Sequence, residues 1–200
     1  MRIIGIDPGT AIIGYSILDF KNGKTELIDY GCIYTDKDLP MPERLEQIFF
    51  KLETLINMYK PDHMAIEELF FFKNQKTIIS VAQARGVIVA KAQISGIEIF
   101  NYTPLQVKTG ITGYGRAEKK QVQEMIKIIL KLDEIPKPDD AADAIAIAIN
   151  HINTIRGVGA LLNNPRDRVN KVTQIIEKNK MKNKNVISIE DYKNILKKKK

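Results

Sequence analysis

The chain has 200 residues, 44% of them hydrophobic, which suits one domain with a substantial core. A single cysteine excludes an intramolecular disulfide and a zinc site built of thiolates, and no apolar stretch reaches the roughly 18 residues of a membrane span, so we expect a soluble cytoplasmic protein without membrane contact. The net charge of +7 resides in 165–200, which has 12 basic and 4 acidic residues. The rest of the chain has 19 basic and 20 acidic residues, so residues 1–164 could bind a polyanion only through local basic clusters.

The beginning of the chain predicts three strands and a helix. Arg2 to Asp7 is an apolar, β-branched run that fills both faces, as in a central strand covered on both sides. Two further strands, 14–20 and 27–35, flank an Asn-Gly pair typical of a hairpin turn. Apolar residues at steps of three and four then predict a helix over 42–59.

The following stretch alternates strands and helices. We expect a strand over 63–70, a helix over 77–95, a strand over 97–102, and helices over 117–132 and 139–156. Three glycines within 109–115 predict a flexible loop at that position. The fold class that follows is α/β, with a five-stranded mixed sheet flanked by helices on both faces.

Residues 1–164 are expected to form one domain, and 165–200 a lysine-rich, flexible C-terminal extension. Ser188 and Asp191 could cap a short amphipathic helix near the end of this extension, and a solvated, frayed tail is the favoured alternative. In the predicted helix 77–95, Ala82, Gly86 and Ala90 recur every four residues, which lets another backbone approach closely. That backbone could belong to the chain's own sheet or to a second subunit.

Asp7 is the first of three acidic positions that draw attention. It ends the first strand before Pro8 and Gly9, and Gly5, two residues earlier on the same face, leaves room beside its carboxylate. Because Asp before Pro-Gly is also ordinary turn chemistry, a residue that merely caps the turn is the alternative.

Glu67 and Glu68 form the second acidic position, between an apolar strand and a run of phenylalanines. A glutamate in such a run is costly to bury unless it is paired or binds a cation. Since successive strand residues point to opposite faces, only one of the two can join Asp7.

Asp139, Asp140 and Asp143 form the third acidic position, at the start of a helix that continues as Ala-Ile-Ala-Ile-Ala-Ile and is therefore expected to be buried. Asp140 and Asp143 are three residues apart and share a helix face. Capping is the alternative, because Asp139 is a natural N-cap and acids in a first turn complement the helix dipole.

Together these acids bring more negative charge than a core tolerates without compensation, and a divalent cation would compensate it. An all-oxygen ligand set favours Mg²⁺ or Mn²⁺, and the sequence has no Cys/His cluster for zinc. Carboxylates that share two metal ions can activate water and stabilise the leaving oxygen of a phosphodiester. The residues thus favour metal-dependent phosphoryl chemistry.

Seven short motifs, in this order and at these spacings, resemble the RuvC family of Holliday-junction resolvases, which are nucleases with an RNase H-like fold. The resemblance covers about residues 1 to 160. The motifs are Gly5-Ile6-Asp7-Pro8-Gly9 with Gly14-Tyr15, Ala65-Ile66-Glu67, Gln83-Ala84-Arg85-Gly86, Gln106-Val107-Lys108, Ala117-Glu118-Lys119, Gln121-Val122-Gln123 and Asp140-Ala141-Ala142-Asp143-Ala144.

The resemblance implies that Asp7, Glu67, Asp140 and Asp143 are the catalytic, metal-binding set. It implies two Mg²⁺ ions per active site, with Mn²⁺ able to substitute. The neighbouring acids Glu68 and Asp139 lie beside the matched positions and are not expected to be ligands.

The resemblance also implies a DNA-binding surface. Phe70 matches an aromatic residue that inserts against bases near the crossover, although a core phenylalanine is the alternative. Lys108 and Lys119 match basic positions near the DNA, and Arg116 and Lys120 extend that cluster. Weaker candidates for phosphate contacts are Lys73, Lys76 and Arg85, which a solvated surface explains nearly as well.

Members of the family are homodimers that resolve four-way junction DNA in recombination and repair, by nicking two strands of like polarity symmetrically. A two-fold enzyme on a two-fold substrate favours the dimer interpretation of the small-residue face. Family resemblance gives the junction-binding and branch-migration proteins RuvA and RuvB as partners. The extension 165–200 departs from the family pattern in its length and lysine content.

Three alternatives stay open at this stage. The nearest is another RNase H-like nuclease that acts on RNA or an RNA–DNA hybrid. An actin-like or sugar-kinase ATPase would explain the Gly5 to Thr10 turn, but it needs a second domain with its own glycine-rich phosphate turn. A non-enzymatic junction-binding protein is disfavoured, because unneutralised carboxylates do not help to bind a polyanion.

Overall fold

The computed structural model describes residues 1–69 and 75–162. The chain divides into two units, Met1–Ile155 and Arg156–Lys200, and the fold described below is that of the first unit. The predicted DNA contacts Phe70 and Lys73, the domain boundary expected after residue 164 and the whole extension 165–200, including its candidate terminal helix, lie outside the described residues. They stay predictions.

Five strands form one mixed sheet in the order β3-β2-β1-β4-β5. The strands are β1 (Arg2–Asp7), β2 (Ile12–Lys21), β3 (Lys24–Tyr34), β4 (His63–Glu67) and β5 (Glu98–Tyr102). The first three strands pair antiparallel, whereas β4 runs parallel to both β1 and β5. The predicted five-stranded mixed sheet is confirmed, and β1 is its central strand.

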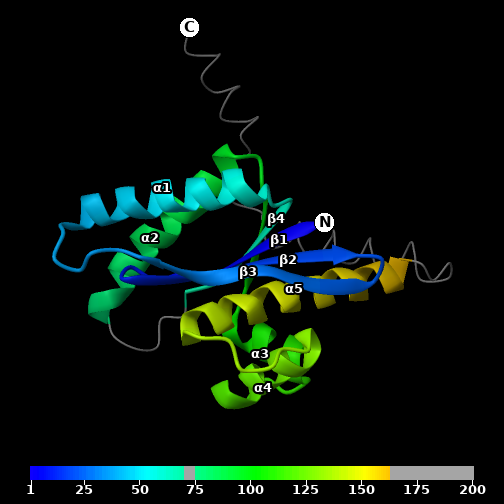
Figure 1. The fold of residues 1–200 in the computed structure, drawn as a ribbon. Coiled ribbons are helices and arrows are strands. Elements are labelled where there is room, and N and C mark those ends of the chain that lie inside the picture. Colours follow the sequence, from blue (N-terminus) through cyan, green and yellow to red (C-terminus); the bar gives the residue numbers. More distant parts are fainter. Residues whose placement is uncertain (70–74, 163–200) are drawn as a thin grey trace, which may run out of the picture. The chain divides into compact units, whose positions relative to one another are not determined.

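Helices cover both faces of the sheet (Figure 1). They are α1 (Met41–Tyr59), α2 (Gln75–Ile94), α3 (Pro104–Thr112), α4 (Lys119–Leu130) and α5 (Asp139–Leu162). One face carries α1 and α2, and the other carries α5 with α3 and α4 packed beside it. Within the described ranges, none of these helices is both long and apolar enough to cross a bilayer.

Each face of the sheet has its own core, and β1 contributes to both. Ile4 and Ile6 pack toward α1 and α2, whereas Ile3 packs toward α5. Successive residues of a strand point to opposite faces, so a strand that is apolar throughout is suited to this central place. Asp7 is the last residue of this buried strand and lies at its C-terminal end.

The helix α3 occupies a stretch that was expected to begin a flexible loop, so the loop prediction was wrong for residues 109–112. Thr103 caps the helix, because its side chain accepts a hydrogen bond from Gln106 N while the Gln106 side chain accepts one from Thr103 N. Gly110 lies against α5, and a Cβ there would meet Asn150 Oδ1 at 1.9 Å. Close packing, and not flexibility, explains this glycine.

The strand β4 is shorter than the predicted 63–70, since it ends at Glu67. Its pairing with β1 stops at Ile66, while its pairing with β5 continues to Glu67 and Tyr102. Glu68 N still donates a hydrogen bond of 2.8 Å to Tyr102 O. Glu67 therefore lies where the chain leaves the sheet, supported only on its β5 side by strand pairing.

Among the described residues, none covers the small-residue face of α2. Ala82, Gly86 and Ala90 are exposed, and a Cβ on Gly86 would meet nothing within 4 Å. The opposite side of the helix packs on the sheet through buried Ala84 and Ile88. The interpretation that the small residues pack on the chain's own sheet was wrong.

A buried polar chain ties α5 to β4 and β5. His151 of α5 is fully buried, and its Nδ1 lies 2.7 Å from Tyr102 Oη while its Nε2 lies 3.0 Å from His63 Nδ1. Burial, together with the nearby His63, lowers the pKa of His151 to about 4. The imidazole is therefore neutral at pH 7, and its contacts hold α5 against the two strands that end beside the candidate site.

Candidate active site

The four predicted catalytic acids come from three elements that meet at one edge of the sheet. Asp7 ends β1 and Glu67 ends β4, and these two strands are parallel neighbours. Asp140 and Asp143 lie in the first turns of α5, which covers the same face of the sheet. Electrostatic coupling links Asp7 to each of the other three acids.

Two glycines bring the start of α5 onto β1 and β2. A Cβ on Gly5 would meet Ala144 O at 2.2 Å, and a Cβ on Gly14 would meet Asp140 O at 1.9 Å. Ser16 Oγ adds a hydrogen bond of 2.9 Å to Ala144 O. The room that Gly5 was expected to leave beside Asp7 is thus filled by the α5 backbone, which is what brings the helix acids close.

Burial and mutual repulsion make these carboxyl groups hard to ionise. The pKa of Asp7 rises to about 8, mainly because the group is buried and also because of the charges of Glu67, Asp143 and Asp140, while Lys119 opposes the shift. The pKa of Glu67 rises to about 7, mainly because of burial and also because of the charge of Asp143, while Lys108 and Lys119 oppose the shift. The described cations therefore compensate the cluster only in part.

Lys119 is the principal cation of the site. From the first turn of α4, its Nζ lies 2.8 Å from Asp143 Oδ2 and 3.3 Å from Asp139 Oδ2. Burial raises the pKa of Asp143, and the hydrogen bond from Lys119 opposes that shift. The exposed Asp139 also accepts a hydrogen bond of 3.0 Å from Gln123 Nε2. Asp139 thus has two partners of its own.

Glu68 points away from the other acids. Glu67 and Ala65 share the face that packs toward α5, whereas Glu68 follows Ile66 onto the opposite side. Glu68 lines a separate surface hollow with Leu69 and Arg85. The expectation that only one of the two glutamates joins Asp7 is confirmed.

Apart from Arg85, the predicted basic residues fall into three groups. Lys108 and Lys119 line a cavity of about 230 Å³ together with Glu67 and Asp143. Arg116 and Lys120 are exposed and lie outside the lining of this cavity, with Lys120 on an apolar hollow between α3 and α4. The side chain of Lys76, like Phe70 and Lys73, is not among those described.

Arg85, a weak candidate for a phosphate contact, has two partners within the protein. Its Nε donates a hydrogen bond of 3.1 Å to the main-chain carbonyl of Glu67, and its Nη2 donates one of 2.5 Å to Asn101 Oδ1. The guanidinium is thus engaged at the end of β4. The sequence offered only the proximity of Arg85 to Gly86 in a matched motif, which does not reveal these contacts.

The acids have the donor chemistry for a hard divalent cation, but they are not arranged as a ligand shell. Within the described part of the chain, no group of three His, Cys, Asp or Glu side chains is placed to hold a metal ion. Asp143 is paired with Lys119 instead. The donor set fits Mg²⁺ or Mn²⁺, because it consists of carboxylate oxygens whose repulsion is incompletely compensated.

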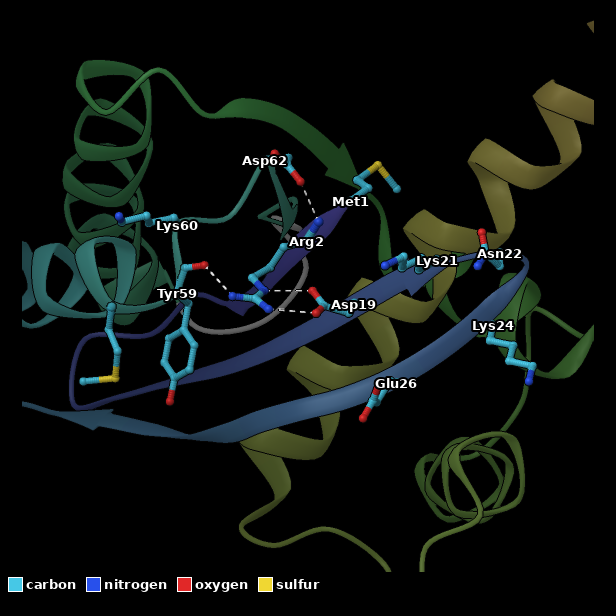
Figure 2. A pocket seen from close by; sticks show the side chains of 11 residues that line it. Met1, Arg2, Asp19, Lys21, Asn22, Lys24, Glu26, Tyr59, Lys60 and Asp62 are labelled. Carbon is cyan, nitrogen blue, oxygen red and sulfur yellow. Dashed lines mark hydrogen bonds and ion pairs between the residues drawn. The ribbon is translucent and has the colours of Figure 1, made fainter.

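A larger hollow, of about 720 Å³, lies at the opposite end of β1 and does not share the chemistry of this site (Figure 2). Arg2 there donates to both carboxylate oxygens of Asp19 and to Tyr59 O, and its main-chain N–H donates to Asp62. These groups satisfy one another.

A mixed sheet in this order, with acids at the ends of β1 and β4 and at the start of α5, defines a nuclease of the RNase H-like class. The model of the family described as "Crossover junction endodeoxyribonuclease RuvC" matches residues 3–151. The chain belongs to this RuvC family.

Similar proteins extend this result. The crossover junction endodeoxyribonuclease RuvC of Fusobacterium nucleatum is 54% identical over 198 residues, which cover 99% of this chain and 100% of that protein. The protein of the same name from Brevibacillus brevis is 52% identical over 151 residues, 76% of this chain and 91% of the relative. The Fusobacterium alignment includes nearly all of 165–200, so the extension is not peculiar to this chain.

Two solved structures share the fold. The Thermus thermophilus RuvC structure is 32% identical, with a TM-score of 0.73 over 79% of this chain and 97% of that one. The structure of T. thermophilus RuvC in complex with a Holliday junction substrate gives a TM-score of 0.75, again at 32% identity, over 79% of this chain and 96% of that one. The expected RNase H-like fold is confirmed.

Proposed function

We propose that Asp7, Glu67, Asp140 and Asp143 form the catalytic centre with which this crossover junction endodeoxyribonuclease resolves Holliday junctions. The observation that carries the proposal is the convergence of four carboxyl groups, from the ends of two parallel strands and one helix, at a place where described cations compensate them only in part. The family assignment makes the reaction a hydrolysis of phosphodiester bonds. It does not favour the alternative of a nuclease for RNA or RNA–DNA hybrids.

In this proposal the four carboxylates would hold Mg²⁺, with Mn²⁺ able to substitute and two ions per site. A bound divalent cation activates water and stabilises the leaving oxygen of a phosphodiester. The protein's own contribution is to place the carboxylates on two strands and a helix that are fixed by close packing, so that little reorganisation is left for the reaction. Asp7 and Glu67 must be ionised to act as ligands, and their raised pKa values mean that loading the site releases protons.

Lys119 and Lys108 are proposed to bind the phosphates that flank the cleaved bond. Both line the cavity beside Glu67 and Asp143, which is where a backbone phosphate would approach the acids. Lys119 can exchange its contact with Asp143 for a phosphate once that carboxylate is engaged elsewhere. Arg116, which precedes α4, and Lys120, in the first turn of α4, would contact DNA further out, and Phe70 and Lys73 complete the proposed DNA-binding set.

We further propose that the protein acts as a homodimer through the exposed small-residue face of α2. A two-fold dimer presents two equivalent sites to a junction with two-fold symmetry. RuvA and RuvB as partners and a cytoplasmic location stay predictions from the resemblance and the sequence. The extension 165–200 is proposed as a separate basic segment that strengthens DNA binding through its charge.

Cleavage of a mobile four-way DNA junction tests the proposal, with linear duplex and RNA–DNA hybrid in parallel. In Mg²⁺ the wild-type protein should cut the junction in two strands of like polarity and leave the other substrates nearly intact. Asp7→Asn, Glu67→Gln, Asp140→Asn and Asp143→Asn should each reduce cleavage at least about 100-fold, since each removes a charge from the site, while junction binding in Ca²⁺ persists. Glu68→Gln is the matched control and should cut normally.

Equal cutting of junction and linear duplex would contradict junction selectivity. Activity that survives Asp7→Asn, or cleavage that is unaffected by EDTA, would contradict the proposed centre. Preferential cutting of the hybrid would revive the alternative that the family assignment disfavours.

A further inference from the structure

Arg85 joins three elements at the point where β4 ends. It lies on α2, and its guanidinium reaches the main-chain carbonyl of Glu67 on β4 and the side chain of Asn101 on β5. The distances are 3.1 Å from Nε to the carbonyl and 2.5 Å from Nη2 to Asn101 Oδ1. A planar guanidinium that donates in two directions fixes its acceptors in orientation as well as in distance.

Glu67 needs such support because strand pairing holds it on one side only. Pairing between β1 and β4 ends at Ile66, and the next main-chain contact is the hydrogen bond from Glu68 N to Tyr102 O. When the backbone of the last residue of a strand moves, the carboxylate of that residue moves with it. The Arg85 contact removes that freedom on the side away from α5.

Arg85 approaches Glu67 from the face opposite the other acids. Its helix packs on the sheet through Ala84 and Ile88, in the core shared with α1, and Asn101 lies two residues from Ile99 on the same face. The carboxylate of Glu67 lies with Ala65 on the α5 face. The guanidinium can therefore hold the backbone of Glu67 without occupying the space around the acids.

We propose that Arg85 is a positioning residue that fixes the backbone of Glu67, and with it the catalytic carboxylate, from the reverse side of the sheet. This inference rests on the proposed catalytic role of Glu67. It gives Arg85 a task other than phosphate binding, although the residue also lines an open hollow of about 510 Å³ where a phosphate contact would be sterically possible. The two roles differ in what they do to DNA binding and to the rate of cutting.

The test is Arg85→Lys, which keeps the positive charge but loses the planar guanidinium that donates to two acceptors at once. Single-turnover cleavage of a four-way junction is measured at saturating protein, together with junction affinity in Ca²⁺ over a series of salt concentrations. The single-turnover rate should fall by up to about 10-fold, because a small misplacement of a catalytic group is costly. The affinity for the junction and its salt dependence should stay unchanged. The Mg²⁺ concentration for half-maximal rate should rise, and excess Mg²⁺ should restore part of the rate.

Arg2→Lys is the matched control. Arg2 also donates to a main-chain carbonyl and to a side-chain carboxylate, but it does so at the far end of β1 (Figure 2). It should lose stability without changing the rate or the Mg²⁺ requirement of the folded protein. Asn101→Ala is the second variant, which removes one acceptor of Arg85 and should give a smaller change of the same kind, even if Arg85→Lys folds poorly.

Three outcomes would overturn the inference. If both variants cut at the native rate with the native Mg²⁺ requirement, Arg85 positions nothing. If the affinity of Arg85→Lys falls and its salt slope changes while the saturated rate is normal, Arg85 binds phosphate. If only thermal stability falls in both variants, the contact is structural alone. Glu67→Gln separates these cases from a failure of the proposed function, because a Glu67→Gln protein that still cuts would refute the catalytic centre itself.

Discussion

At the scale of the residue, the proposed role of Asp7 comes with a cost in stability. Burial and three like charges make its ionised form unfavourable, so that its pKa rises from 3.8 to about 8. A carboxyl group whose pKa is raised on folding contributes its full stabilisation at pH values below its pKa in the unfolded chain. That contribution is lost as the pH rises through its pKa in the folded protein. The metal-free protein should therefore become less stable between about pH 4 and pH 8 on account of this residue.

We expect Asp7→Asn to remove this cost, and with it the proposed catalytic carboxylate. Because an amide of the same shape carries no charge, the metal-free variant should unfold about 5 °C above the metal-free wild type at pH 8. At pH 4 the two proteins should unfold within a degree or so of each other, since both side chains are then largely neutral. Thermal unfolding in EDTA, followed by circular dichroism, gives the comparison.

Added Mg²⁺ provides the control for this measurement. It should stabilise the wild-type protein at pH 8 and have much less effect on Asp7→Asn, because the variant lacks one carboxylate. An Asp7→Asn protein that is less stable than wild type at pH 8 would show that the carboxylate stabilises the fold and would contradict its assignment to a repulsive cluster.

Among the elements, the contact of α5 with the strands determines the geometry of the site. Gly14 lies directly beneath the start of α5, where any Cβ would meet the backbone of Asp140. We expect Gly14→Ala to destabilise the protein by about 2 kcal/mol, because the backbone must shift to admit the methyl group. Cleavage by the folded fraction should also fall, since the same shift displaces Asp140.

Gly157→Ala serves as the control for this substitution. It adds a methyl group to α5 where a Cβ meets none of the described atoms within 4 Å, so it should leave cleavage unchanged and stabilise the helix slightly. Chemical denaturation and single-turnover cleavage are the two measurements. A Gly14→Ala protein with native stability and rate would show that the close approach has no influence on the site.

Most elements could be predicted because their patterns are local. The β-branched run of β1, the Asn-Gly hairpin and the apolar periodicity of α1 each contain their own signal. The helix α3 was missed although Thr103 and Gln106 are spaced as a capping box, because the reason for Gly110 is Asn150, which lies 40 residues away. Three glycines near each other indicate flexibility when their packing partners are unknown.

The acidic residues of the candidate site could be predicted from the sequence, whereas the contacts that hold them in place could not. Asp7 and Glu67 could be found because a carboxylate at the end of an apolar run contradicts burial, and that contradiction is visible in the sequence. The hydrogen bond from Ser16 to Ala144 and the contact of Arg85 with Glu67 join residues far apart in the chain. A serine within the apolar β2 was the one local signal for such a contact.

At the scale of the whole molecule, the open face of α2 predicts self-association. Gly86→Glu places a charge at its centre, and the monomer has room for the side chain because a Cβ there meets nothing within 4 Å. Since a two-fold interface brings copies of the same face together, the new charges would repel each other, and the dissociation constant should rise at least about 10-fold. Sedimentation equilibrium measures this change.

Asn57→Glu, an exposed substitution on α1, is the control and should leave association unchanged. Circular dichroism should show native secondary structure for both variants. If wild type is a monomer at every concentration tested, or if Gly86→Glu associates as tightly as wild type, the dimer does not form through this face.

The burial of α5 has a consequence for how the enzyme loses activity on heating. The segment that carries Asp140 and Asp143 continues directly into Ala144 to Ile149, which is buried almost completely between the sheet and the α3–α4 pair. Segments with this much burial are the last to open, and exposed ends open first. Two of the four acids are thus attached to the most durable part of the molecule, so heat inactivation should coincide with global unfolding and not precede it.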